Sequence, residues 1–171
     1  MKPTIVIGSD HAGFMMKAFI VKKLREEGFL VEDLWTDSEE SVSFAEIARP
    51  VAQAVAASGE KCGILICGTG IGMSIMANKV KGIRAALVHD LFSAKATREH
   101  NDSNILCMGA RIISEAMGWE IAHTWLHTEF LGGKYQQRLQ FITDYENENK
   151  QWKHSRLCCR AGILTWSGTI W

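Results

Sequence analysis

The sequence predicts a three-layer α/β fold, in which a five-stranded parallel sheet is flanked by helices on both faces. Short runs rich in β-branched residues alternate with segments of helical periodicity, and 171 residues are enough for one such domain. The predicted strands are residues 4–8, 30–34, 63–67, 84–88 and 104–108. Because parallel strands need crossover connections, we expect the helices between them to cover both faces of the sheet.

The helices are predicted from apolar spacing and from end signals. From Phe14 to Leu24 apolar residues recur at helical spacing, basic side chains follow, and Gly28 provides a C-cap. Residues 44–57 repeat the pattern, but Pro50 lacks the N–H that an interior helical position donates, so we expect a kink or a later start. Further helices are predicted at residues 71–80, 118–130 and 135–145.

Residues 150–171 differ in kind from the rest of the chain. They show no clear period and carry three tryptophans and two cysteines: Trp152, Cys158, Cys159, Trp166 and Trp171. We therefore expect one domain over residues 1–149 and a C-terminal tail of uncertain structure. The tail is too apolar for an ordinary solvated terminus, which leaves two alternatives open: docking on a partner subunit, or a terminus without a role in the chemistry. We favour the second.

Composition excludes several classes of function. The 19 basic and 19 acidic residues cancel, which argues against binding to nucleic acid or to a membrane surface through bulk charge. No apolar stretch approaches the roughly 20 residues of a membrane span, and no signal-peptide pattern opens the chain. The 5 cysteines are scattered, without the paired spacing of a zinc site. We expect reduced thiols, no bound metal and a cytoplasmic location.

Polar residues follow several of the predicted strands. Ser9-Asp10-His11-Ala12-Gly13 follows the first strand, Cys67 with its glycine loop ends the third, His89-Asp90 follows the fourth, and His100-Asn101-Asp102 stands near the fifth. Because ligands of parallel sheets bind at the carboxyl ends of the strands, we expect these groups to share one crevice. A thiol, imidazoles and a carboxylate can transfer protons there near neutral pH.

Cys67 on its glycine loop is the most informative feature. The loop N–H groups and the positive end of the following helix favour a thiolate and an anionic substrate. The run Gly68-Thr69-Gly70-Ile71-Gly72 spaces its glycines as GxGxG, which fails the dinucleotide fingerprint, and it lacks the lysine of a P-loop. What remains is a nest of N–H groups that can hold an oxyanion or a phosphate.

These residues also have ordinary structural explanations. A cysteine at a strand end is more often an inert buried thiol, and we expect this of Cys62 and Cys107, which lack a glycine loop. Asp10 could cap a helix that begins near Ala12. The pair at residues 89–90 is explained better as a surface histidine before an N-cap than as catalytic, and residues 98–102 could be a solvated helix end.

Seven segments in order resemble the ribose-5-phosphate isomerase B family: SDHAG (9–13), GILICGTGIGMS (63–74), ANK (77–79), GIRAA (82–86), REHND (98–102), GAR (109–111) and EFLGG (129–133). The resemblance covers about the first 145 residues. Subunits of galactose-6-phosphate isomerase share the fold, but the REHND run is more similar to the ribose enzymes. The resemblance implies a Rossmann-like fold and an enzyme that interconverts ribose 5-phosphate and ribulose 5-phosphate through an enediol, without metal or organic cofactor.

The resemblance also implies roles for individual residues. Cys67 would move the proton between C1 and C2, while N–H groups from Gly68, Gly70, Ile71 and Gly72 hold the enediolate oxygen. Asp10 and Thr69 would orient sugar hydroxyls, and His100 would help to open the furanose ring, with Asn101 beside it. The phosphate would be received by His11, Arg111, Lys134 and Arg138. In this family the site forms at a subunit interface, so we expect a homodimer or a dimer of dimers.

Three positions depart from the family pattern. Phe44 replaces a tyrosine near the sugar, Ala45 replaces the proline that usually follows, and Lys134 replaces an arginine and loses its bidentate fork. Two alternatives therefore stay open. One is an isomerase of another aldose phosphate, such as galactose 6-phosphate or allose 6-phosphate. The other is a non-catalytic module that binds a sugar phosphate or a nucleotide.

Overall fold

A computed structural model describes residues 2–34 and 40–148, and the predicted tail at 150–171 lies outside the described residues. One parallel sheet is formed by β1 (Thr4–Ser9), β2 (Val31–Asp33), β3 (Lys61–Cys67), β4 (Ala85–Leu87) and β5 (Ile105–Gly109). The strands are ordered β2-β1-β3-β5-β4. The predicted five-stranded parallel sheet is therefore confirmed.

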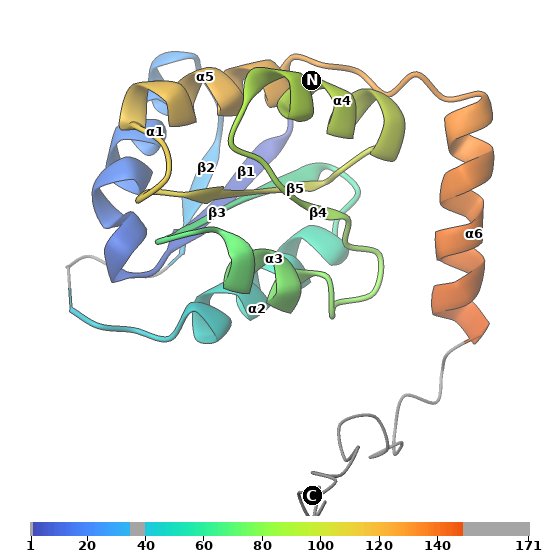
Figure 1. Ribbon diagram of the computed structural model, residues 1–171, viewed down its shortest axis with the longest axis horizontal. Coiled ribbons are helices and arrows are strands. Elements are labelled where there is room, and N and C mark those ends of the chain that lie inside the picture. Colours follow the sequence, from blue (N-terminus) through green and yellow to red (C-terminus); the bar gives the residue numbers. More distant parts are fainter. Residues whose placement is uncertain (1, 35–39, 149–171) are drawn as a thin grey trace, which may run out of the picture.

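Helices cover both faces of this sheet, as expected. One face carries α1 (Phe14–Glu26), α4 (Leu91–Asn101) and α5 (Glu115–Leu126), and the other carries α2 (Phe44–Ala56) and α3 (Ile71–Ala77) (Figure 1). A single turn of 3-10 helix, η1 (His11–Gly13), precedes α1. The last described helix, α6 (Lys134–Glu148), stands at one side of the body.

The period-two alternation of the central strands divides the core into two halves. In β3, Ile64 and Ile66 are buried against the α1, α4 and α5 side, whereas Leu65 and Cys67 are buried against the α2 and α3 side. Successive side chains of a strand point to opposite faces, so a strand buried on both faces reads as a continuous apolar run. Cys67 is thus the last core residue of its strand as well as the first residue of the loop.

Element boundaries differ from the sequence prediction in a few places. The helix α2 begins at Phe44 with Pro50 inside it, so the later start is wrong. The helix α5 begins three residues before the predicted 118, because the Ser114 hydroxyl accepts a hydrogen bond from the N–H of Met117 at 3.2 Å and caps it. Gly28 follows the C-cap residue Glu27 and takes a left-handed φ of +78°, so it ends α1 from one position beyond the C-cap rather than at the predicted C-cap itself.

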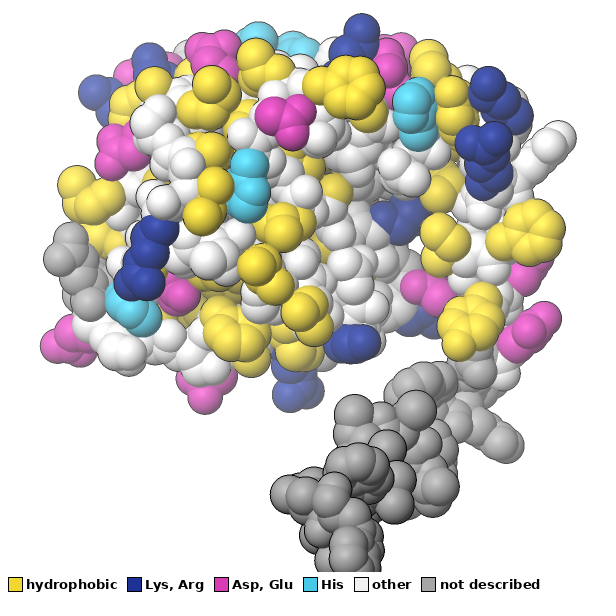
Figure 2. Space-filling model, viewed as in Figure 1, with side chains coloured by type: hydrophobic (Ala, Val, Ile, Leu, Met, Phe, Trp, Pro, Cys, Tyr) yellow, Lys and Arg dark blue, Asp and Glu magenta, His cyan; other side chains and the backbone are white. Residues whose placement is uncertain are grey.

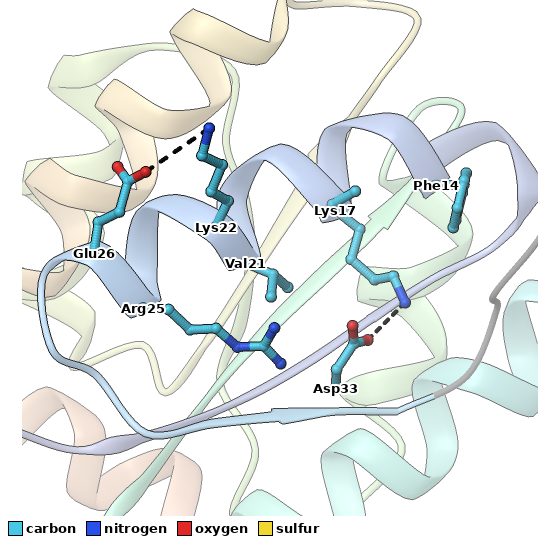
Figure 3. Close-up of a pocket in the computed structure, with 8 residues that line it drawn as sticks. Phe14, Lys17, Val21, Lys22, Arg25, Glu26 and Asp33 are labelled. Carbon is cyan, nitrogen blue, oxygen red and sulfur yellow. Dashed lines mark hydrogen bonds and ion pairs between the residues drawn. The ribbon is translucent and has the colours of Figure 1, made fainter.

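A buried ion pair joins α1 to the edge strand β2. The Lys17 ammonium lies 2.6 Å from Oδ1 of Asp33, and the lysine side chain is only 2% exposed (Figure 3). The hollow beside this pair has a volume of about 590 Å³ and is lined by α1 residues such as Phe14 and Arg25 together with Asp33. It contains none of the candidate site residues, so we assign it no part in the chemistry.

The helix α6 packs weakly on the body. Leu139 is its one buried residue, whereas Phe141, Ile142 and Tyr145 are exposed. In Figure 2, hydrophobic side chains lie along this helix and basic side chains gather near its first turns. Among the described helices, none has the length and apolar character needed to cross a membrane.

Candidate active site

The loop after β3 is built around the Cys67 thiol. Cys67 is 6% exposed, and its Sγ accepts a hydrogen bond from the N–H of Gly70 at 3.1 Å. Gly70 has a φ of +77°, and a Cβ there would lie 2.5 Å from Cδ1 of Leu87 and 2.9 Å from the carbonyl carbon of Met108. Both the backbone conformation and the available space therefore require glycine at this position.

The turn that follows β5 supports the loop from the side. The N–H of Ala110 donates to the carbonyl of Cys67 at 2.8 Å, and the N–H of Arg111 donates to the carbonyl of Gly68 at 3.0 Å. The Arg111 side chain also lies over Gly68, because a Cβ added to that glycine would be 3.6 Å from the guanidinium carbon. The structure thus brings a predicted phosphate-binding arginine to the glycine loop.

Asp10 and His11 lie at the neighbouring carboxyl end of β1. The chain leaves β1 toward β2 on one side and returns to β3 on the other, and ligands of such sheets usually bind where the strand order reverses in this way. Asp10 is 8% exposed, and its Oδ1 accepts hydrogen bonds from the N–H groups of Ala12 at 3.0 Å and Gly13 at 3.2 Å. The N-cap explanation is therefore confirmed, and it leaves Oδ2 outside these bonds.

His11 carries a buried polar atom without a partner. Among the described residues, Nδ1 of His11 makes no hydrogen bond although it is shielded from solvent. Such groups are rare in folded proteins, and each calls for an explanation such as a missing ligand or water. His11 follows β1 at the same end of the sheet as the glycine loop after β3, so a ligand bound at this end would explain the unpartnered nitrogen.

Thr69 and Gly72 complete the loop. The Thr69 hydroxyl is exposed and accepts a hydrogen bond from the N–H of Ile71 at 3.4 Å. A Cβ on Gly72 would lie 2.8 Å from Cε2 of Phe44, so the aromatic ring packs directly on this glycine. The helix α3 has only 7 residues, so an anion bound here would depend on the loop N–H groups rather than on a long helix dipole.

A second polar cluster gathers where α4 ends and α6 begins. The imidazole of His100 stacks on the ring of Tyr135, with centroids 4.4 Å apart. The Lys134 ammonium lies 5.1 Å and the Arg138 guanidinium carbon 5.7 Å from the same ring. Sequence reasoning missed Tyr135, although its position next to Lys134 and one helical turn before Arg138 was a usable signal.

The two clusters lie at opposite edges of the sheet within one chain. The helix α4 runs from the carboxyl end of β4 back to the start of β5, so His100 and Asn101 lie at the amino end of β5. Cys67 ends β3 at the carboxyl edge. The expectation that His100 and Asn101 share a crevice with Cys67 in one chain is therefore wrong, because a crossover helix between parallel strands returns the chain to the opposite edge.

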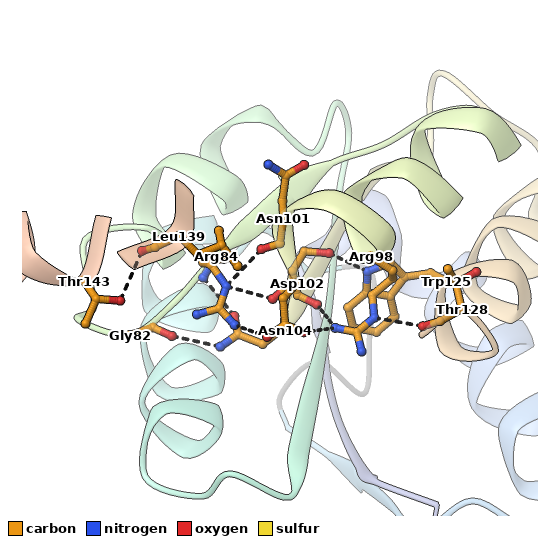
Figure 4. A network of polar contacts seen from close by, with 11 residues as sticks. Gly82, Arg84, Arg98, Asn101, Asp102, Asn104, Trp125, Thr128, Leu139 and Thr143 are labelled. Carbon is orange, nitrogen blue, oxygen red and sulfur yellow. Dashed lines mark hydrogen bonds and ion pairs between the residues drawn. The ribbon is translucent and has the colours of Figure 1, made fainter. Parts of the chain in front are cut away.

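Residues 98–102 are more ordered than a solvated helix end. The Arg98 side chain is 19% exposed, and its guanidinium pairs with Asp102 at 3.1 Å. The same carboxylate accepts a bond from Arg84 at 2.8 Å, and Asn104 donates to the carbonyl of Gly82 at 2.8 Å (Figure 4). This network fixes the end of α4, and Asp102 takes a left-handed φ of 44° within it.

The residues at 89–90 divide between two roles. Oδ1 of Asp90 accepts from the N–H of Ser93 at 2.7 Å, which confirms the predicted N-cap of α4. The hydrogen bond to the Ser93 N–H holds the pKa of Asp90 below its usual value. His89 is half-buried rather than on the surface, since its Nε2 accepts from the N–H of Gly109 at 3.0 Å and braces the end of β5.

The other described cysteines differ from Cys67 in their surroundings. Burial raises the pKa of the Cys62 thiol, and burial raises that of the fully enclosed Cys107 further. A neutral, enclosed thiol is a poor base and nucleophile. Cys62, Cys67 and Cys107 are all free thiols in the structure.

Comparison with known proteins agrees with this architecture. Residues 5–142 match the family model described as Ribose/Galactose Isomerase. The protein YwlF of Bacillus subtilis (strain 168) is 52% identical over 85% of this chain and 98% of its own length. Ribose-5-phosphate isomerase B of Escherichia coli (strain K12) is 44% identical over 83% of this chain and 95% of its own length. D-erythrulose-4-phosphate isomerase of Pectobacterium atrosepticum is 39% identical over 86% and 97%.

Solved structures agree over the same region. A structure of ribose-5-phosphate isomerase B from Clostridium thermocellum has a TM-score of 0.83 and 43% identity, over 85% of this chain and 98% of its own. The Mycoplasma genitalium enzyme with bound ribulose-5-phosphate has a TM-score of 0.82 and 37% identity, over 85% and 97%. These matches define the class of protein, an aldose–ketose isomerase on a parallel α/β sheet. The chain belongs to the Ribose/Galactose Isomerase family.

Proposed function

We propose that this protein interconverts ribose 5-phosphate and ribulose 5-phosphate through an enediol, with Cys67 as the base. The observation that carries the proposal is the position of its Sγ, which ends a buried strand and accepts the N–H of Gly70 at 3.1 Å inside a glycine loop. The relatives named for ribose 5-phosphate support this substrate.

The proposed reaction balances within the substrate and the base. The Cys67 thiolate removes the proton from C2 of the open-chain aldose, while O1 gains a proton, which gives the enediol. The O2 hydroxyl then loses a proton, which balances the one that O1 gained, and the thiol gives C1 the proton that it took from C2, which yields the ketose. No net oxidation or reduction occurs, since one carbon is reduced as its neighbour is oxidised.

The loop N–H groups carry the partial positive charge that can stabilise a negatively charged intermediate. Negative charge develops on the enediolate oxygen, and we assign its stabilisation to N–H groups of Gly68, Gly70, Ile71 and Gly72. Those of Gly70 and Ile71 donate to Sγ of Cys67 and to the Thr69 hydroxyl in the structure, so in this proposal they exchange partners when substrate binds. One such preorganised donor is worth about 3 kcal/mol in comparable sites. Thr69 and the Oδ2 atom of Asp10 orient the sugar hydroxyls in this proposal, and His100 opens the furanose ring with Asn101 beside it.

We further propose that two copies of the chain complete each site. His11 and Arg111 lie at the glycine-loop edge, whereas Lys134 and Arg138 lie beside His100. One phosphosugar cannot reach both edges of one sheet, but a second copy can bring its own His100 cluster to the first copy's loop. Apolar side chains near the loop and on α6 are exposed, as a dimer interface requires: Ile71, Ile75, Leu87, Phe92, Phe141 and Ile142.

A substrate panel tests the proposed function. We expect turnover of ribose 5-phosphate to exceed that of allose 6-phosphate, galactose 6-phosphate and D-erythrulose 4-phosphate, with exchange of the C2 proton into solvent. Binding of these compounds without product or exchange would instead identify a non-catalytic module.

A second candidate function rests on Phe44. Its ring packs on Gly72 and is 42% exposed, so an apolar surface without a hydroxyl borders the loop. An isomerase of another aldose phosphate is the outcome if ribose 5-phosphate is not the best substrate. The Phe44→Tyr variant separates the two, because a restored hydroxyl contact raises turnover of ribose 5-phosphate relative to the six-carbon substrates.

A further inference from the structure

We propose that Glu27, His123 and His127 form a binding site for a divalent transition metal ion of the zinc class. Glu27 is the C-cap of α1, His123 lies in the last turn of α5 and His127 is the C-cap of α5. One ligand atom from each of the three side chains lies within 4.8 Å of the other two. This cluster shares no residue with the glycine loop or with the His100 cluster.

The ligand atoms lie close together across the junction of two helices. Nε2 of His123 lies 3.4 Å from Oε1 of Glu27, and Nε2 of His127 lies 3.9 Å from Oε2. In a tetrahedral zinc site with bonds of about 2.0–2.1 Å, ligand atoms are about 3.3 Å apart. The three side chains are 30–44% exposed, so they can close this small difference by adjusting their rotamers.

The surroundings of His127 favour the tautomer in which Nε2 can bind a metal ion. Its Nδ1 lies 2.9 Å from the carbonyl oxygen of His123 and donates a hydrogen bond to it in the tautomer that leaves the Nε2 lone pair toward Glu27. Metal-binding histidines usually make such a bond through their other nitrogen, which fixes the tautomer and the ring orientation.

Charge also favours a cation at this position. Among the described residues, no lysine or arginine pairs with the Glu27 carboxylate, and Lys2 bonds only to the main-chain oxygen of Glu27. The imidazoles stack with centroids 4.2 Å apart, so two cationic rings would repel each other, whereas one divalent ion attracts both nitrogens and the carboxylate. The negative end of the α5 dipole adds to this attraction. Two imidazoles and one carboxylate suit zinc, with water in the fourth position.

Metal titration of the metal-free full-length chain tests the proposal. Cys158 and Cys159 are changed to serine first, because thiols elsewhere in the sequence also bind zinc. We expect one equivalent of Zn²⁺ to displace a chromophoric chelator and to raise the melting temperature. We expect Co²⁺ to give visible d–d bands without a thiolate charge-transfer band.

Three variants locate the ion. We expect Glu27→Gln and His127→Gln to bind Zn²⁺ about a hundredfold more weakly or worse, since even residues behind the ligands change affinity ten- to a hundredfold. Glu26→Gln is the matched control, because that neighbouring carboxylate pairs with Lys22 and Lys23 instead. Unchanged binding by both ligand variants overturns the proposal, as does a thiolate band. If the chain with Glu27 and both histidines intact gives no d–d bands with Co²⁺, the proposal is overturned, and this result does not depend on whether a ligand variant folds.

Discussion

The N–H of Gly70 donates to Sγ of Cys67 across 3.1 Å, and Gly70 does so in a left-handed conformation, with a φ of +77°. The hydrogen bond joins the two features that the sequence presents side by side, a strand-end thiol and a glycine loop. A side chain at Gly70 would collide with Leu87 and with the backbone of Met108. The geometry at the thiol therefore depends on strands β4 and β5 as well as on the loop itself.

Cys67→Ala is expected to keep the fold and to lose activity. Loss of a positioned general base lowers kcat/KM by about 10²–10⁴-fold, because such groups contribute that much to proton transfer. The rate of ribose 5-phosphate isomerisation checks this. Cys62→Ala is the control, since burial keeps that thiol neutral, and its rate should match the parent protein. Activity of Cys67→Ala within tenfold of the parent would remove Cys67 as the base.

Gly72→Ala is expected to destabilise the protein through Phe44. The new methyl group would lie 2.8 Å from Cε2 of the ring, and overpacking of this kind costs about 1–3 kcal/mol. In urea unfolding, Gly72→Ala should cost less stability when Phe44→Ala is already present than in the parent protein, since the clash disappears. Gly59→Ala, where the added Cβ meets nothing within 4 Å, should be close to neutral. Strict additivity of the two changes would show that the ring and the glycine do not interact.

Mixing two inactive variants is expected to restore activity if sites are shared. Cys67→Ala and Arg138→Ala refolded together in equal amounts should recover about a quarter of the parent activity, because half of the dimers hold one intact site of two. Cys67→Ala mixed with Arg111→Ala should recover none, since Arg111 lies over Gly68 of the same chain. Equal recovery in both mixtures, or none in either, contradicts the shared site.

Ser103→Ala is expected to destabilise the core. The indole N–H of Trp125 donates to the Ser103 hydroxyl at 2.8 Å, and the two residues are 0% and 1% exposed. Loss of the acceptor leaves a buried donor unpaired, which costs about 1–3 kcal/mol. Urea unfolding followed by tryptophan fluorescence measures this change. Ser41→Ala, at an exposed position, should change stability little, and equal effects of both substitutions would rule out the hydrogen bond as the cause.

Asp90 is expected to contribute to the acid dependence of stability. Its pKa is lowered in the folded state, so the folded protein binds fewer protons than the unfolded chain in acid. The contribution is therefore present above the unfolded pKa and is lost as the pH falls through the folded value. Asp90→Asn keeps an acceptor for Ser93 but does not titrate. The difference in melting temperature between parent and variant should stay constant near neutral pH and shrink as the pH falls below the ordinary aspartate pKa of about 3.9, and a difference that stays constant in acid would contradict this.

Some residues of the candidate site could be predicted from the sequence, and others could not. Asp10, His11 and Cys67 were proposed from the sequence because each stands at the carboxyl end of a strand, and parallel strands end at the same edge. The position of His100 in the single chain was predicted wrongly because this residue precedes β5 rather than following it. It therefore lies at the amino end of the sheet, a full strand length away from the carboxyl end. Tyr135 was missed, and His89 was interpreted as a surface residue, since a stacking ring and a bracing imidazole have no motif of their own.

The sequence by itself determined the order of strands and helices, the buried faces and the glycine loop at Cys67, because these depend on local periodicity and on backbone conformations that few residues adopt. Only the tertiary structure decided that β5 lies between β3 and β4, that Phe44 packs on Gly72 and that the His100 cluster lies at the far edge from Cys67. These relationships join residues distant in the chain, and strand order and packing set them rather than any local signal. The separation of the two edges is the physical reason that a complete site requires a second copy in our proposal.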